Sequence, residues 1–103
     1  MKFMLEYSYP ASNFVAVMKA WGAQSPKEMA SVGEGVKLLS RSHDFAGRRA
    51  WVTVESNDLA AVIRWVGGWS PLTIPVITPV FDDEESGPFA RQIAGQSQRL
   101  MFN

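Results

Sequence analysis

The sequence contains no cysteine and only one histidine among its 103 residues. The absence of cysteine excludes disulfide bonds, thiolate metal sites and thiol nucleophiles. No apolar run approaches the roughly 20 residues that a membrane-spanning helix needs. The segment that follows Lys2 is too short and too polar for a signal peptide. We therefore expect a cytoplasmic protein that has no membrane partner.

The sequence also has no excess of charge, because ten Lys and Arg residues balance ten Asp and Glu residues. Such a surface generates no general field for polyanions, so we expect no nucleic-acid partner. No Ser-His-Asp pattern, phosphate-binding glycine loop or zinc motif is present. The four acids at 82–85 are without the alternating ligand spacing of a calcium loop and indicate a solvated turn. We therefore expect no metal and no cofactor.

The residues that are present alternate between strand-like and helix-like segments. Strands are predicted at 2–9, at 36–45 and 48–55 (a hairpin around Ala46-Gly47) and at 72–81, with helices after 13 and after 58. The order β-α-β-β-α-β is the ferredoxin-like arrangement, with spatial strand order 4-1-3-2. We expect one α+β domain over residues 1–81, a four-stranded antiparallel sheet with two helices on one face. Residues 82–103 are predicted to form an acidic turn and a C-terminal tail, helical after Gly87-Pro88.

Three features refine this prediction. The prolines at 75 and 79 have no N–H to donate, so strand 72–81 should lie at an edge of the sheet. Apolar stripes at helical spacing define the buried helix faces, and they comprise Phe14, Val17, Met18 and Trp21, then Leu59, Val62, Ile63 and Val66. Trp65 lies off the second stripe and Trp69 follows that helix. Each is interpreted either as plain packing or as part of a pocket mouth or subunit contact.

The sheet face that the helices leave open is the candidate site. Alternation along strands 2–9 and 48–55 places Glu6, Trp51 and Glu55 there. A two-residue turn at Ala46-Gly47 pairs His43 with residue 50, whereas a three-residue loop with a left-handed Gly47 pairs it with Trp51. We favour the second register, because burying Arg41 and His43 under the helices would cost several kcal/mol unless they are paired. The predicted ligand-binding residues are Glu6, Arg41, His43, Trp51 and Glu55.

This set supports two chemical interpretations and one structural one. His43 is the candidate catalytic residue, since imidazole transfers protons near neutral pH. Arg41 is suited to bind a small carboxylate or enol. In the structural alternative, Arg41 pairs with Glu6 or Glu55 across the sheet or across a dimer interface.

An RNA-binding module with the same strand order stacks bases on aromatic residues of its first and third strands. Trp51 matches one stacking position, but Arg49 and Val54 stand where aromatic residues belong. The sequence therefore does not favour RNA binding.

Several blocks of the chain resemble an uncharacterised bacterial family, domain of unknown function 3303. They are residues 2–4, 35–39 with Arg41 and His43-Asp44, 54–55 with Trp65, and 78–80 leading to the acids at 82–85. The resemblance implies a ferredoxin-like fold and carries over no catalytic residue. The plan is also similar to dimeric α+β barrel proteins, whose two sheets pack face to face, although His43 does not map onto the axial histidine of haem-binding members.

The sequence does not determine what the protein does. The leading hypothesis is a homodimer, formed through the open sheet face, with a pocket for a small polar or aromatic molecule and with or without cofactor-free acid/base chemistry. The alternative is a structural or protein-interaction module that uses the same face and has no small-molecule ligand. Loss of turnover in His43→Ala would favour an enzyme, and saturable thermal stabilisation without turnover a binding module.

Overall fold

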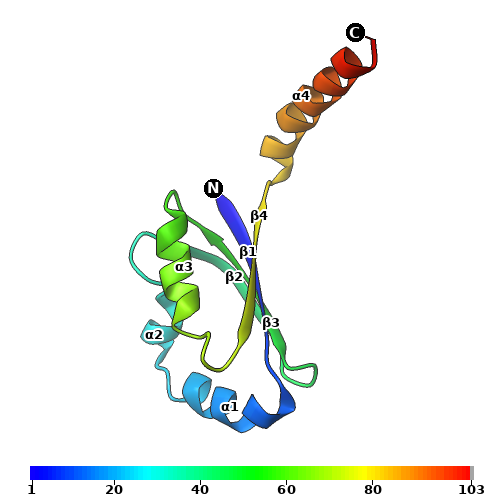
Figure 1. Ribbon diagram of the computed structural model, residues 1–103. Helices are drawn as coiled ribbons and strands as arrows, with labels where there is room; N and C mark the ends of the chain where they lie inside the picture. Colours follow the sequence, from blue (N-terminus) through cyan, green and yellow to red (C-terminus); the bar gives the residue numbers. More distant parts are fainter. Residues whose placement is uncertain (103) are drawn as a thin grey trace.

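The computed structural model describes the backbone of residues 1–102 and the side-chain surroundings of residues 1–96. Four strands, β1 (Lys2–Ser8), β2 (Lys37–Asp44), β3 (Arg49–Glu55) and β4 (Ile74–Val80), form one antiparallel sheet in the order β2-β3-β1-β4. A 3₁₀ turn η1 (Ala11–Asn13), α1 (Phe14–Gly22) and α2 (Pro26–Ala30) connect β1 to β2, and α3 (Leu59–Gly67) connects β3 to β4. Helix α4 (Asp83–Phe102) follows β4 (Figure 1). The predicted ferredoxin-like α+β arrangement and strand order are confirmed.

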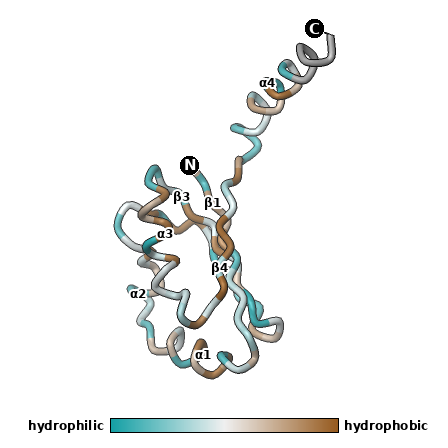
Figure 2. The backbone as a smooth tube through the Cα atoms, in the orientation of Figure 1, coloured by the Kyte–Doolittle hydropathy of each residue, from teal (hydrophilic) through white to brown (hydrophobic). Residues whose placement is uncertain are grey.

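The core lies between the sheet and α3. Strands β1 and β3 alternate as predicted, and β1 contributes Phe3, Leu5 and Tyr7 while β3 contributes Val52 and Val54. Val62 and Val66 of α3 pack against these five residues and complete the core. Figure 2 shows hydrophobic residues in the strands of the sheet and in α3. Within the described residues, no helix combines the length and the apolar character that crossing a bilayer demands.

Helix α3 buries a different side from the one that the sequence stripe predicted. Val62 and Val66 are buried, but Leu59 and Ile63 are 50% and 51% exposed. Trp65, predicted to lie off the stripe, packs against the core instead. The loop before β2 explains the rotation, because it lies against this side of the helix. A Cβ added at Gly33 would lie 3.5 Å from the Trp65 Cβ, and both Gly33 and Gly35 have positive φ (87° and 80°).

The hairpin adopts the register that we did not favour. His43 pairs with Ala50 and Arg41 with Val52, whereas Ser42 pairs with Trp51. Since directly paired residues share a face, Arg41 and His43 lie on the helix-covered face and not on the open one. The left-handed residue of the turn is Arg48 (φ 55°) rather than Gly47.

Asp44 stabilises this register by holding the turn closed. Its Oδ1 accepts a hydrogen bond from the Gly47 N–H (2.9 Å), and its Oδ2 accepts one from Arg49 Nε (3.1 Å). Both contacts lower the pKa of the Asp44 carboxyl. A bulge between Leu38 and Ser40 then shifts the alternation along β2, so that Leu38 and Arg41 face the helices together.

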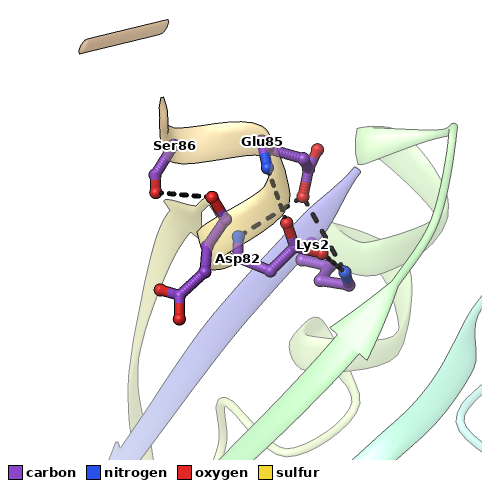
Figure 3. A network of polar contacts seen from close by, with 5 residues as sticks. Lys2, Asp82, Glu85 and Ser86 are labelled. Carbon is purple, nitrogen blue, oxygen red and sulfur yellow. Dashed lines mark hydrogen bonds and ion pairs between the residues drawn. The ribbon is translucent and has the colours of Figure 1, made fainter. Parts of the chain in front are cut away.

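Strand β4 lies at the sheet edge, as the two prolines predicted, with Pro75 opposite Tyr7 and Pro79 opposite Phe3. Helix α4 begins at Asp83, before Gly87-Pro88 and not after it as predicted. Asp82 and Glu85 cap it reciprocally, because the Glu85 N–H donates to Asp82 Oδ1 (2.8 Å) and the Asp82 N–H to Glu85 Oε1 (3.4 Å; Figure 3). The predicted position of the Leu100 side chain lies outside the described residues.

Candidate functional site

A cavity lies between the covered sheet face and helices α1 and α3. Its cavity volume is about 60 Å³, smaller than the roughly 300–1,000 Å³ of drug-sized sites, so a bound molecule would extend into its open mouth. Half of its twelve lining residues are Tyr, Trp or Phe, namely Tyr7, Tyr9, Trp21, Phe45, Trp65 and Trp69. Besides the two tyrosine hydroxyls, the polar side chains of the wall are Arg41, His43 and Thr73. We call this space the aromatic cavity.

The aromatic rings of the cavity form two contacting groups, which together span four elements and the segment after α3. Trp21 of α1 lies 6.2 Å from Trp69 and 4.9 Å from the imidazole of His43, measured between ring centroids. Trp65 of α3 meets Tyr7 of β1 edge to face at 6.1 Å. Edge-to-face pairs are a favourable aromatic geometry. Helix α1 therefore brings Trp21 onto the polar side chains of the edge strand β2, whereas α3 brings Trp65 onto β1.

Arg41 is the only fully charged side chain in the wall of this cavity as described. Its guanidinium lies 4.8 Å from the centre of the Trp21 ring and donates from Nη1 to the Met29 carbonyl of α2 (2.6 Å). Burial lowers the pKa of Arg41, although a guanidinium stays protonated in proteins. No Asp or Glu is among the described residues that line the cavity. Arg41 therefore brings a positive charge and spare N–H donors to an apolar space.

Tyr7 adds a polar atom that is buried and unpartnered. Its hydroxyl is the one buried side-chain polar atom within residues 1–96 that has no hydrogen-bond partner. Burial raises the pKa of Tyr7, which the nearby positive charge of Arg41 partly opposes. The hydroxyl is therefore neutral at pH 7 and free to donate a hydrogen bond.

His43 and Phe45 mark the mouth of the cavity, since both are exposed members of its wall. Their rings stack, with centroids 5.2 Å apart and an interplanar angle of 23°. Partial burial, followed by the positive charge of Arg41, lowers the pKa of His43. The imidazole is therefore biased toward its neutral form, which both donates and accepts hydrogen bonds.

The structure separates the five predicted ligand-binding residues into two groups. Arg41 and His43 reach the aromatic cavity, whereas Glu6, Trp51 and Glu55 belong to the opposite, open face. The predicted constellation is therefore not assembled within one chain. No group of three or more His, Asp or Glu side chains in the described part of the chain is arranged to hold a metal ion.

Sequence reasoning missed Tyr7 and Trp21 as site residues because it assigned both to the core. Trp65 and Trp69, which the sequence leaves open as plain packing, pocket or subunit-contact residues, both line the cavity.

Comparison with known proteins extends what the geometry shows. A family model described as a domain of unknown function, DUF3303, matches residues 1–94. The chain belongs to this family. The matched range includes all four strands of the sheet and every residue that lines the aromatic cavity of this DUF3303 protein. No curated protein and no solved structure matches the chain.

Proposed function

We propose that this DUF3303 protein binds a small anionic molecule with a flat, apolar body in the aromatic cavity. The observation that carries the proposal is Arg41, a charged side chain turned into an aromatic space whose described wall contains no carboxylate. This moves the binding hypothesis from the open sheet face to the covered face. Binding is favoured over catalysis because no described acidic residue lines the cavity to orient His43 for proton transfer.

The polar groups of the cavity suit a carboxylate. Arginine has five N–H donors, and the structure shows one of them bound to the Met29 carbonyl. A carboxylate in the cavity would accept charge-assisted hydrogen bonds from the others, which are roughly twice as strong as neutral ones. The Tyr7 hydroxyl offers a further donor from β1, which β3 separates from β2.

The apolar walls suit a planar body. Trp21, Trp65 and Trp69 surround the cavity from α1, α3 and the segment after α3. Such rings favour offset stacking or edge-to-face contact with another aromatic ring. His43, at the mouth, is placed to contact the end of a ligand that lies nearest to solvent.

We further propose that the protein is a homodimer through the open sheet face. This face exposes large apolar side chains from two adjacent strands, with exposed fractions of 43% for Met4, 62% for Ile74 and 55% for Val76. A contiguous exposed apolar patch commonly marks a protein contact. Glu6, Trp51 and Glu55 would then lie at the subunit interface rather than against a ligand.

Thermal-shift measurements with benzoate and indole-3-carboxylate, each compared with its neutral amide, test the binding proposal. We expect the carboxylates to raise the melting temperature saturably and the amides to have a much smaller effect. A ligand at 100 times its Kd stabilises the folded state by about 2.7 kcal/mol. Arg41→Met should abolish the carboxylate preference, whereas the control Arg64→Met, on the exposed side of α3, should retain it.

The possible results separate the functional classes. Equal stabilisation by acids and amides would show a cavity that binds without using Arg41. No stabilisation by any of the four compounds would contradict the binding proposal and favour the interaction module.

A further inference from the structure

Helix α4 projects away from the rest of the chain. Figure 1 shows it continuing beyond β4, clear of the sheet and of the other helices. The molecule measures 58 × 28 × 21 Å and has a radius of gyration of 17.5 Å, whereas a compact domain of 100 residues has one of about 13 Å. The helix is therefore not packed on its own domain.

The composition of α4 is unsuited to a helix that stands alone in water. It contains Gly87 and Gly95, and Pro88 lies in its interior. Glycine and proline are the poorest helix formers, and isolated helices are marginal even without them. Phe89 and Ile93, one turn apart and 46% and 45% exposed, form an apolar side of α4, and Figure 2 shows this helix separated from the rest of the chain. A surface that covers this side is needed to keep α4 helical.

The start of α4 is fixed in a direction that points away from the chain's own sheet. Lys2 Nζ forms ion pairs with Asp82 and with Glu85 (3.8 Å for the latter), and the two acids also cap the helix (Figure 3). Phe81 packs against Phe89 with ring centroids 4.9 Å apart. Only Phe81 and Asp82 separate β4 from α4. Folding α4 back over its own open face would require a full reversal within these two residues and the loss of both contacts.

We propose that a second copy of this chain covers α4, so that each helix lies on the open sheet face of its partner. This inference rests on the proposed homodimer and identifies what occupies the open face. A two-fold exchange covers both unpartnered surfaces, the α4 side and the face with Met4, Ile74 and Val76, in one contact. Charge is complementary as well, since neither Glu6 on the sheet nor Arg91 on α4 has an ion-pair partner within residues 1–96.

The area of such a contact is sufficient for a stable dimer. The 20 residues of α4 form a rod roughly 30 Å long and about 10 Å across, with a footprint of about 300 Å². Two helices on two sheets bury four such footprints, about 1,200 Å² in total. This reaches the lower bound of about 1,200 Å² for stable specific interfaces.

Engineered cysteines test the exchange without background, because the chain has no cysteine of its own. The double variant Ile93→Cys with Val76→Cys is oxidised mildly and run on a non-reducing gel, and Ile93→Cys with Met4→Cys samples a second sheet position. We expect a disulfide-linked species of twice 11.4 kDa from at least one pair. The matched control, Ile93→Cys with Val15→Cys on the exposed side of α1, should stay monomeric. An intramolecular disulfide in both pairs would overturn the proposal, as would no cross-link in either.

Mass measurement by light scattering separates failure of the exchange from failure of the homodimer. We expect a dimeric wild type, a monomeric Ile93→Asp variant and a dimeric Val15→Asp control. A dimeric Ile93→Asp variant would overturn the exchange and leave a dimer of sheets packed directly. A monomeric wild type would overturn both proposals.

Discussion

Replacing Tyr7 by phenylalanine should stabilise the unliganded protein while weakening its binding of carboxylates. The Tyr7 side chain is 7% exposed, and its hydroxyl is buried without a partner. Leaving a buried polar group unsatisfied costs about 1–3 kcal/mol. The Tyr7→Phe variant removes that cost and preserves the ring that meets Trp65 edge to face.

The expected gain is large enough to measure by urea and thermal unfolding. For a domain of about this size, 1 kcal/mol corresponds to a shift of roughly 4–8 °C in melting temperature. Tyr9→Phe is the matched control, because Tyr9 is equally buried but its hydroxyl is not among the buried unpartnered atoms. We expect the control to change stability by less than about 0.5 kcal/mol. A Tyr7→Phe variant that is no more stable than wild type would refute the reasoning and indicate a bound water on the hydroxyl.

The pH dependence provides a second measurement of the same group. Burial raises the pKa of Tyr7 above the ordinary value of 10.0. Because the folded-state pKa lies above the unfolded one, the unfolded state loses this proton first as the pH rises. Wild-type stability should therefore fall above about pH 10 more steeply than that of Tyr7→Phe, and parallel profiles would contradict a buried neutral hydroxyl.

Two further predictions concern the helices. Val62→Ala should lower the free energy of unfolding, measured in urea, by roughly 2 kcal/mol, because Val62 is fully buried. The neighbouring control Ile63→Ala should lower it by less than about 0.5 kcal/mol, because Ile63 is 51% exposed. Equal losses of stability would contradict the observed buried side of α3. The ion pair with Lys2 lowers the pKa of the folded-state Asp82 carboxyl below its ordinary 3.8. The stabilisation from this contact should therefore be fully present above pH 3.8, and it should be lost as the pH falls through the lowered pKa of Asp82. Circular dichroism should then show α4 helicity falling below about pH 4 in wild type and already reduced at pH 7 in Asp82→Asn, whereas unchanged helicity in both would rule out a role for the pair.

The strand order was predictable because its determinants are local. Alternation in β1 and β3 identified the covered face, and the prolines at 75 and 79 identified β4 as an edge strand. Each prediction depends only on residues within one segment and on rules for how such segments connect.

The side of α3 was not predictable in the same way. Leu59 and Ile63 flank the Val62–Val66 line on one side, and Trp65 flanks it on the other. Both sides are apolar in sequence. The choice between them depends on the loop with Gly33 and Gly35, which is distant along the chain and packs only against the Trp65 side.

The hairpin register failed for an energetic reason. The prediction from the sequence considered the desolvation free energy lost on burying Arg41 and His43, but the contacts that compensate for it are formed by residues far away in the sequence. The offset comes from the Met29 carbonyl and the Trp21 ring, which α2 and α1 bring to the edge strand. The bulge after Leu38 also invalidated the simple alternation along β2.

Three departures from ordinary core chemistry meet in the aromatic cavity. Arg41 is half-buried without an acidic partner in the described wall, the Tyr7 hydroxyl is unsatisfied, and His43 is biased toward its neutral form. Each of the three is unfavourable for stability, and a core under selection for stability alone would replace them with apolar residues. Such local conflicts are expected at functional sites, where binding compensates for them. A single carboxylate would neutralise the charge and satisfy the hydroxyl together, which is why the cavity, rather than the open sheet face, is the stronger candidate for the ligand.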